Sequence, residues 1–394
     1  MWQKLQARLE QRKAQDLLRQ RLTLEGAQSV RIRAEGREYL NFSSNDYLGL
    51  ANHPKLIEAM QKAAKQYGVG SGASHLIIGH SEQHHALEEE LAEFLGVERA
   101  LLFSTGYMAN YAVLTCLPDK NDLIIQDKLN HASLIDGGMA SPAKMLRYAH
   151  ADLESFERQM KQPVESRLVV TDGVFSMDGD IAPLPELVTS CKKHKASLMV
   201  DDAHGFGVLG EQGKGSLEHV DLAQQTADIY MATFGKALGG FGAFVAGSEL
   251  LIESLIQFGR SYIYTTAMPA AVAAANRAGL KLIQQEAWRR EQLHKNIVYF
   301  RRLASEYHIP LMPSETAIQP VLIGRNDKTL AISRALKEAG ILLVAIRPPT
   351  VPENSARLRV TLTAEHTTDD IDYLLEQLAL HIKQAKHNAE RGNG

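Results

Sequence analysis

One lysine of this 394-residue chain stands in an unusual setting. Lys236 lies within the glycine-rich segment ATFGKALGG (232–240), and the apolar run DIYMATF (228–234) leads directly into it. A phosphate-binding P-loop would place a serine or threonine immediately after its lysine, but Ala237 stands there, so that motif is excluded. A loop lysine taken by itself is most often a solvated surface residue. Residues elsewhere in the chain must therefore decide whether Lys236 has a chemical role.

Polar residues follow several other apolar runs at the point where each run ends. These runs lead into Gly106, His131, Asp172 with Ser176, Asp201 with Asp202 and His204, and Thr233. In an open parallel sheet, ligands bind beyond the carboxyl ends of the strands. We therefore expect one rim of a sheet to gather a lysine, a carboxylate, two histidines, hydroxyls and the N-terminus of a helix.

These groups match the requirements of pyridoxal phosphate (PLP). The cofactor needs a lysine for its Schiff base and an acid that keeps its ring nitrogen protonated. Its phosphate suits a helix N-terminus, where free N–H groups and the helix dipole favour an anion. The glycines around Lys236 would let the backbone approach a bound ring without a Cβ in the way. The residue types therefore predict PLP as the cofactor.

Short apolar runs alternate with helical patterns through the middle of the chain. The predicted strands are 100–105, 122–127, 167–174, 197–203, 228–234 and 242–247, and the predicted helices are 84–96, 106–117, 153–162 and 184–194. This alternation is typical of an α/β protein whose mostly parallel central sheet is covered by helices. Several runs are apolar throughout, as strands buried on both faces should be.

The pattern changes after Ala267. One long helical stretch, a run at 317–324, a helix over 328–340, runs at 341–349 and 357–366, and a terminal helix indicate a smaller α+β domain. At the other end, Trp2 and the leucines up to Leu22 favour an amphipathic helix. We expect an N-terminal helical arm with short strands over 1–47, a large domain over 48–285 and a small domain over 286–394, with a frayed tail at 387–394.

Composition restricts the partners and the compartment. A formal net charge of −3 gives no electrostatic reason to expect nucleic acid, and no apolar run approaches the roughly 18 residues of a membrane span. The N-terminus lacks the apolar stretch of a signal peptide. Cys116 and Cys191 lie beside apolar residues and favour reduced, buried thiols. We expect a cytoplasmic protein without nucleic-acid or membrane partners.

Four neighbouring histidines raise the question of a metal site. The segment HSEQHH (80–85) does not have the HExxH spacing of a zinc-binding helix, and no clear further ligand set follows it. No metal is expected at His75, His80, His84 and His85.

Three long segments resemble the α-oxoamine synthases, a branch of the fold-type-I PLP enzymes, and in particular those of biotin synthesis. They are DGVFSMDGD (172–180), VDDAHGFGVLGEQGKGS (200–216) and TFGKALGG (233–240). The similarity extends from LNFSSNDYLGLANHP (40–54) to IRPPTVPENSARLRVTLTAEH (346–366). The resemblance implies a fold-type-I transferase with a large PLP-binding domain, a smaller C-terminal domain and an N-terminal arm.

The resemblance also implies roles around the cofactor ring. Lys236 would carry the Schiff base and take the Cα proton of the substrate. Asp201 would pair with the ring nitrogen, and His131 would stack on the ring. The phenolic oxygen of the ring would contact Ser176 and His204. The neighbouring Asp202 is expected to be structural and bonded to nearby backbone.

Further roles concern the phosphate. Gly106 and Tyr107, through their backbone, and Thr233 would hold it within one subunit. Thr266 would reach the phosphate of the neighbouring subunit, so the resemblance implies a homodimer with shared active sites.

The remaining implied roles concern the substrates. Asn45 and Arg359 would hold the carboxylate of the amino acid, and His131 would also contact the substrate. Arg19 and Thr350 match positions that contact the acyl substrate. The implied reaction joins L-alanine to a pimeloyl thioester and releases CO₂, the free thiol and 8-amino-7-oxononanoate. The sequence leaves open whether the thioester is on coenzyme A or on an acyl carrier protein.

Some features leave alternatives open. Ala73, Ala267 and Ala270 depart from residues common in the family, so the shape of the acyl channel is not fixed by the resemblance. Glycine C-acetyltransferase and 5-aminolevulinate synthase use the same lysine with glycine and other thioesters, and the segment AIRPPTVP (345–352) argues against them. A PLP-binding protein without catalytic activity is a third alternative, which the set of Lys236, Asp201 and His131 argues against.

Overall fold

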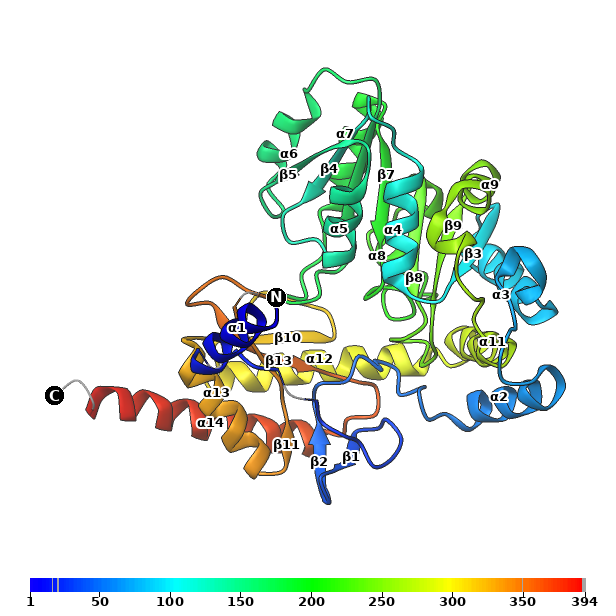
Figure 1. Cartoon of the computed structure of the whole chain (residues 1–394). Helices are drawn as coiled ribbons and strands as arrows, with labels where there is room; N and C mark the ends of the chain where they lie inside the picture. Colours follow the sequence, from blue (N-terminus) through cyan, green and yellow to red (C-terminus); the bar gives the residue numbers. More distant parts are fainter. Residues whose placement is uncertain (16, 20, 349, 392–394) are drawn as a thin grey trace.

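The computed structural model describes residues 1–391 apart from 16, 20 and 349, and a seven-stranded sheet lies at its centre (Figure 1). The strand order is β3-β9-β8-β7-β6-β4-β5. Their bounds are β3 Arg99–Phe103, β4 Leu123–Asp127, β5 Lys144–Tyr148, β6 Arg167–Asp172, β7 Ser197–Asp201, β8 Ile229–Thr233 and β9 Ala243–Gly247. β9 is antiparallel to both of its neighbours and the other pairs are parallel, which confirms the predicted mostly parallel sheet.

Helices cover both faces of this sheet. One face packs against α4 (Gly106–Cys116), α5 (Ala132–Ala140), α9 (Glu249–Phe258) and α10 (Arg260–Ile263). The other packs against α3 (Glu82–Leu95), α6 (Leu153–Met160), α7 (Leu184–His194) and α11 (Ala270–Gln285). Successive strand residues point to opposite faces, so Leu101 and Phe103 join one core and Leu102 the other. Two apolar faces explain why the strands read as continuous apolar runs.

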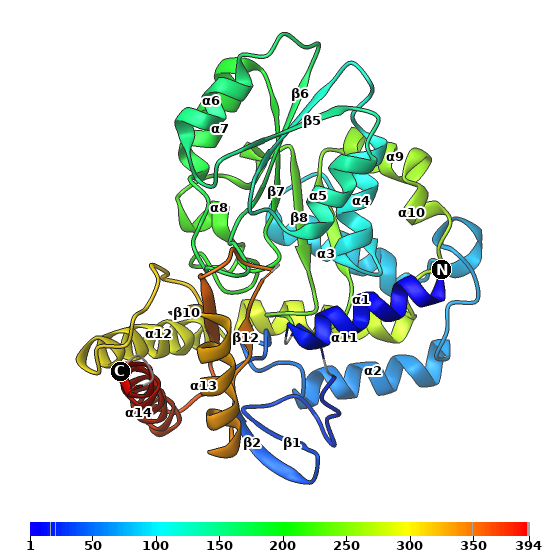
Figure 2. The ribbon, with the colours of Figure 1, turned by 60° about the vertical axis from the view of Figure 1, so that its left-hand side comes forward.

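A second region combines the two ends of the chain (Figures 1 and 2). β10 (Ile318–Gly324), β13 (Ala356–Thr361) and β12 (Ala345–Ile346) form one antiparallel sheet. A second sheet joins β1 (Arg31–Ala34) and β2 (Arg37–Asn41) to β11 (Ile341–Leu342). α12 (Trp288–Glu306), α13 (Asn326–Glu338) and α14 (Thr368–Arg391) complete the region. The boundaries at 47 and 285 stay a prediction.

The remaining elements are α1 (Trp2–Ala14), α2 (Pro54–Tyr67), the single π-helical turn η1 (His75–Gly79), α8 (Ser216–His219) and the 3₁₀ turn η2 (Gln224–Thr226). The described part of the chain contains no helix long and apolar enough to cross a membrane. Both cysteines are free, as expected, but only Cys191 is buried, whereas Cys116 is half-buried.

Three helix predictions were wrong in extent. The N-terminal helix ends at Ala14, and none of its residues is buried, so no core contact extends it toward Leu22. The long helix after residue 267 is two helices, because the backbone leaves helical geometry at Glu286. α14 continues to Arg391, so the frayed tail is wrong for 387–391, while 392–394 lie outside the described residues. Buried leucines such as Leu374 and Leu378 anchor that helix to the core.

Candidate active site

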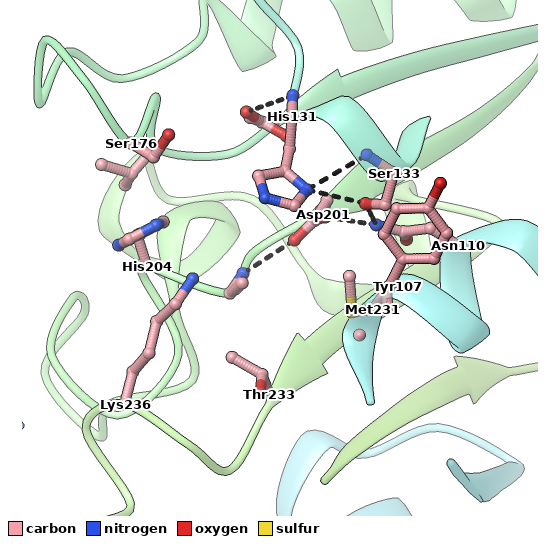
Figure 3. Close-up of a pocket in the computed structure, with 14 residues that line it drawn as sticks. Tyr107, Asn110, His131, Ser133, Ser176, Asp201, His204, Met231, Thr233 and Lys236 are labelled. Atoms are coloured by element: carbon pink, nitrogen blue, oxygen red, sulfur yellow. Dashed lines mark hydrogen bonds between the residues drawn. The ribbon is translucent and has the colours of Figure 1, made fainter. Parts of the chain in front are cut away.

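A cavity of about 200 Å³ opens at the carboxyl ends of β6, β7 and β8 (Figure 3). Asp172, Asp201 and Thr233, the last residues of these strands, line it. The cavity brings together eight of the residues named from the sequence: Gly106, Tyr107, His131, Ser176, Asp201, His204, Thr233 and Lys236. The expected gathering of strand-end groups at one rim is therefore confirmed.

Lys236 reaches into this cavity from the turn after β8 (Figure 3). The turn packs closely on the chain around Leu50. A Cβ on Gly239, whose φ is 72°, would lie 2.4 Å from the backbone carbonyl carbon of Leu50, so only glycine fits there. Burial lowers the pKa of Lys236 to about 8, although Asp201 and Asp172 act in the opposite direction. A lysine with this pKa exchanges its proton near neutral pH, as a general base must.

Two consecutive aspartates at the end of β7, Asp201 and Asp202, have different surroundings. Asp201 faces the cavity, and its Oδ2 accepts a hydrogen bond of 2.7 Å from Nδ2 of Asn110. Asp202 instead accepts from the backbone N–H of Ser216 at 2.7 Å and from the Tyr230 hydroxyl at 2.8 Å. Burial raises the pKa of Asp202 to about 6. The prediction that Asp202 is structural is confirmed.

His131 is the N-cap of α5 and is held from two directions. Its backbone N–H donates to Oδ2 of Asp172 at 3.0 Å. Its ring Nδ1 lies 2.7 Å from Oγ of Ser133 and accepts from the Ser133 backbone N–H at 3.3 Å. Burial lowers the pKa of His131, although the Asp201 carboxylate raises it, so the imidazole is neutral at neutral pH.

Another group of residues lies around His204. Its ring Nδ1 is 2.6 Å from the hydroxyl of the buried Tyr47, and burial holds the pKa of His204 well below its usual value. Arg359 of β13 donates from Nε to the carbonyl of Ser176 at 2.6 Å and from Nη1 to Oδ1 of Asn45 at 3.2 Å. The second region thus contributes a buried guanidinium beside the cavity, at the position where the resemblance implies a carboxylate-binding arginine.

The N-terminus of α4 forms one wall of the cavity. Its N-cap, Thr105, accepts a side-chain hydrogen bond from the backbone N–H of Met108 at 3.2 Å. The first N–H groups of a helix have no acceptor within it, so those of Gly106 and Tyr107 remain for a ligand. This end of the cavity suits an anion.

The residues around the cavity fit PLP. The start of α4 can receive the phosphate, and Asp201 offers a carboxylate to a protonated ring nitrogen. Lys236 provides an amine whose pKa is low enough for it to react. The neutral rings of His131 and His204 can contact the cofactor without adding positive charge.

Comparison with known proteins identifies the family. Residues 37–378 match the model of the family "Aminotransferase class I and II". The chain is 55% identical to the 8-amino-7-oxononanoate synthase of Cellvibrio japonicus, with 95% of each chain covered, and 56% identical to that of Thioalkalivibrio sulfidiphilus, with 95% and 96% covered. The chain belongs to the 8-amino-7-oxononanoate synthases.

Solved structures agree with this membership. A serine palmitoyltransferase from S. paucimobilis, solved with bound PLP, is 29% identical and superposes with a TM-score of 0.92 over 97% of each chain. The 8-amino-7-oxononanoate synthase of Francisella tularensis is 33% identical, with a TM-score of 0.77 over 88% of this chain and 98% of that one. This member of the synthase family is therefore a PLP-dependent acyltransferase with the fold-type-I architecture.

Five residues that the resemblance places in synthase sites do not line the cavity. Two of them, Asn45 and Arg359, lie beside it, because Arg359 bonds both Asn45 and the carbonyl of Ser176. The other three are exposed. Thr266 is exposed, as a residue serving another subunit would be in an isolated chain. Arg19 is exposed after the end of α1, and Thr350 is exposed in the segment between β12 and β13. Their roles toward the phosphate and the acyl substrate stay predictions.

The histidine segment forms a compact cluster. Ligand atoms lie within 4.8 Å of one another in two groups: His75, His80 and His84, and His80, His85 and Glu88. His84 uses both ring nitrogens, since Nδ1 accepts from the Ser81 N–H at 2.9 Å and Nε2 lies 2.7 Å from the carbonyl of Met268. The sequence spacing did not predict this proximity. These two hydrogen bonds give His84 a structural role that explains its burial. The expectation that the cluster binds no metal stays a prediction.

The sequence analysis assigned no role to Asn110, Ser133 and Tyr47, although each contacts a proposed site residue. For Asn110 the sequence did contain an indication of its position. It lies four residues after Gly106, so both belong to one face of the helix whose N-terminus meets the phosphate. Ser133 and Tyr47 left no such pattern, because their contacts depend on how distant segments pack.

Proposed function

We propose that this chain condenses L-alanine with a pimeloyl thioester to give 8-amino-7-oxononanoate, CO₂ and the free thiol in biotin synthesis. The observation that carries the proposal is that Lys236, at a pKa of about 8, and Asp201 line the same cavity in a chain 55% identical to such synthases. PLP, when bound, withdraws electrons from the substrate Cα and so stabilises negative charge there.

Lys236 acts as the general base in this proposal. Its low pKa leaves a substantial fraction of the amine neutral near pH 8, and neutral Nζ takes the Cα proton of alanine. Asp201, which also lines the cavity, would place its carboxylate beside the ring nitrogen and so favour the protonated form of that nitrogen. His131 would stack as a neutral ring on the cofactor.

His204 and Ser176 are assigned to the phenolic oxygen of the cofactor. The Tyr47 hydroxyl occupies Nδ1 of His204, which leaves Nε2 for a ligand. Thr233 is assigned to the phosphate with Gly106 and Tyr107, from the end of β8 beside the turn that carries Lys236.

Arg359 and Asn45 are assigned to the alanine carboxylate. The Arg359 side chain is buried and already points Nη1 at Asn45, so little side-chain entropy is lost on binding. A guanidinium can bind a carboxylate through two parallel hydrogen bonds. When alanine binds, Arg359 can exchange its 3.2 Å hydrogen bond with the neutral Asn45 for one with the charged carboxylate, and this exchange favours binding.

A second cavity, of about 480 Å³, reaches Lys236 and suits the acyl donor. Leu22, Leu24 and Asn45 are among the residues that line it. Arg19 lies three residues before Leu22 and is assigned to the donor together with Thr350. The donor is pimeloyl-CoA or a pimeloyl acyl carrier protein.

We also propose that the chain works as a homodimer with shared sites. Apolar side chains near Thr266 are strongly exposed, including Ile77 at 73%, Ile78 at 80% and Tyr264 at 72%. Ala267 N–H donates to the Ala73 carbonyl at 3.0 Å, so these segments are neighbours. A second copy would cover this surface and receive Thr266. A sedimentation experiment that finds an active monomer would contradict the homodimer. The cytoplasmic location stays a prediction.

The test of the reaction is thiol release from purified, PLP-loaded protein. Alanine and glycine are each paired with pimeloyl-CoA, pimeloyl acyl carrier protein and acetyl-CoA, and kcat/KM is measured for every pair. The proposal expects alanine with a pimeloyl donor to be the best pair. A preference for glycine with acetyl-CoA would indicate a glycine C-acetyltransferase, and release with no pair would indicate a PLP-binding protein without this activity.

A further inference from the structure

Asn110 is buried, at 1% exposed, between two residues of the proposed active site. Its Nδ2 donates to Oγ of Ser133 at 2.8 Å and to Oδ2 of Asp201 at 2.7 Å (Figure 3). Both hydrogens of the amide are therefore used. A flipped amide would bring its oxygen against the Asp201 carboxylate, so the network itself decides the amide orientation.

The hydrogen bond from Asn110 to Ser133 also constrains His131. Because Oγ of Ser133 accepts from Asn110, its own proton is available to Nδ1 of His131 at 2.7 Å. The Ser133 backbone N–H points at the same nitrogen at 3.3 Å. Two donors directed at Nδ1 leave it without a proton, so the neutral ring carries its hydrogen on Nε2.

The carboxylate of Asp201 is held at both oxygens. Oδ2 accepts from Asn110, and Oδ1 accepts from the backbone N–H of Ala203 at 3.1 Å. Only the bond from Asn110 comes from a side chain, so it is the one that a substitution can remove. Without it, the carboxylate loses one of the two contacts that restrain its rotation.

We propose that Asn110 is a positioning residue that aims Asp201 at the ring nitrogen and, through Ser133, sets which nitrogen of His131 is protonated. The inference rests on the proposed function, in which Asp201 and His131 contact PLP. Asn110 and Gly106 share one face of α4, so a single helix positions the phosphate and the groups that control the ring.

The experiment follows the visible absorption of PLP bound to the purified enzyme across pH, together with kcat and KM for alanine. The absorption midpoint is the pH at which the absorption change of bound PLP is half complete. Asn110→Ala is expected to move this midpoint by at least about half a pH unit. It should also lower kcat about tenfold, the effect of losing one hydrogen bond to a charged group. KM for alanine should stay within about twofold, because Arg359 and Asn45 are untouched.

Two further variants separate positioning from folding. Ser133→Ala leaves the Asn110 contact with Asp201 in place and should shift the midpoint less than Asn110→Ala, whereas Ser133→Thr keeps a hydroxyl and should restore the wild-type midpoint. The matched control is Asn296→Ala, which removes a buried amide that donates to the carbonyls of Thr363 and His366. Asn296→Ala should lower the thermal unfolding midpoint without moving the absorption midpoint.

The results distinguish this inference from the proposed function. If Asn110→Ala and Ser133→Ala keep the wild-type absorption midpoint while wild type releases thiol with alanine, the positioning role is overturned and the proposed function stands. An Asn110→Ala enzyme that only loses thermal stability, as Asn296→Ala should, overturns it equally. Wild type without alanine-dependent thiol release contradicts the proposed function itself.

Discussion

Asn110, Ser133 and Asp201 line the cavity and form its proposed ring side, whereas Asn45 and Arg359 lie beside the cavity and form the proposed substrate side. The ring side comes from one sheet and its helices, and its hydrogen bonds measure 2.7 and 2.8 Å. The substrate side joins residues 314 positions apart through one contact of 3.2 Å. The ring side is thus held rigidly before any substrate arrives, while the substrate side keeps a longer contact that a carboxylate can replace.

The largest expected effect tests Lys236, which lies between the two sides. Lys236→Ala should lower kcat by at least about 1,000-fold, because it removes the proposed base and the attachment of PLP. The thermal unfolding midpoint of the cofactor-free protein should not fall, since burying this amine is unfavourable in itself. Borohydride reduction of the wild-type holoenzyme followed by peptide mapping should label Lys236. A label on another lysine would overturn the assignment.

The next effect tests the ring side through its two neighbouring aspartates. Asp201→Asn should lower kcat about 100-fold, because an amide cannot balance the charge of a protonated ring nitrogen. Asp202→Asn is the matched control and should chiefly lower the thermal midpoint, since Asp202 bonds Ser216 and Tyr230. Near-normal exchange of the alanine Cα proton in Asp201→Asn would move the role to another carboxylate.

The same contrast explains what the sequence could predict of the fold. Six of the seven strands of the central sheet are rich in buried apolar residues, so their positions could be read from the sequence with errors of at most two residues at their ends. β5 was missed, because it is an edge strand whose residues are mostly exposed or half-buried. α5 was missed, because Gly137 and Gly138 weaken its helical pattern. A Cβ on Gly137 would lie 3.0 Å from Leu114 of α4, so the glycine serves close packing of two helices. Such a requirement is not visible in local periodicity.

The site shows a similar limit. Strand-end residues such as Asp201 and Lys236 could be gathered by topology alone, because parallel strands end at one rim. The contact of Asn45 with Arg359 depends on how β13 packs beside the large sheet, and only the family resemblance pointed to it. The exposed positions of Arg19 and Thr350 could not be derived from their neighbours in the sequence.

The substrate side is tested by Arg359→Ala. This variant should raise KM for alanine about 30-fold with a smaller effect on kcat, the size expected when a hydrogen-bonded charge is lost. Arg357→Ala is a matched control from the same strand face, because Arg357 is also buried but pairs with Asp178. It should lower the thermal midpoint and leave KM for alanine within about twofold. Equal KM values for the two variants would contradict the assignment of Arg359.

A pH experiment tests how strongly the cavity perturbs Lys236. Its pKa is lowered to about 8 from an ordinary 10.5, so the reactive neutral amine is present above about pH 8 and is lost as pH falls. The initial rate at which cofactor-free protein takes up PLP should therefore rise about tenfold from pH 7 to 9 and then level off. A rate that keeps climbing tenfold per unit beyond pH 9 would show an unperturbed lysine.

The smallest expected effect concerns Arg19, at the outer edge of the substrate side. Its side chain is exposed, and an exposed charge pair contributes little because water and salt screen it. Arg19→Ala should raise KM for the pimeloyl donor about two- to fivefold and leave KM for alanine unchanged. Arg21→Ala, which removes another exposed charge two residues later, is the matched control and should change neither value. The Arg19 effect should shrink between 50 and 300 mM salt, because a screened interaction weakens with ionic strength. An unchanged KM for the donor at low salt would show that Arg19 is a solvated arm residue, and the donor contacts would then have to come from the cavity lined by Leu22 and Leu24.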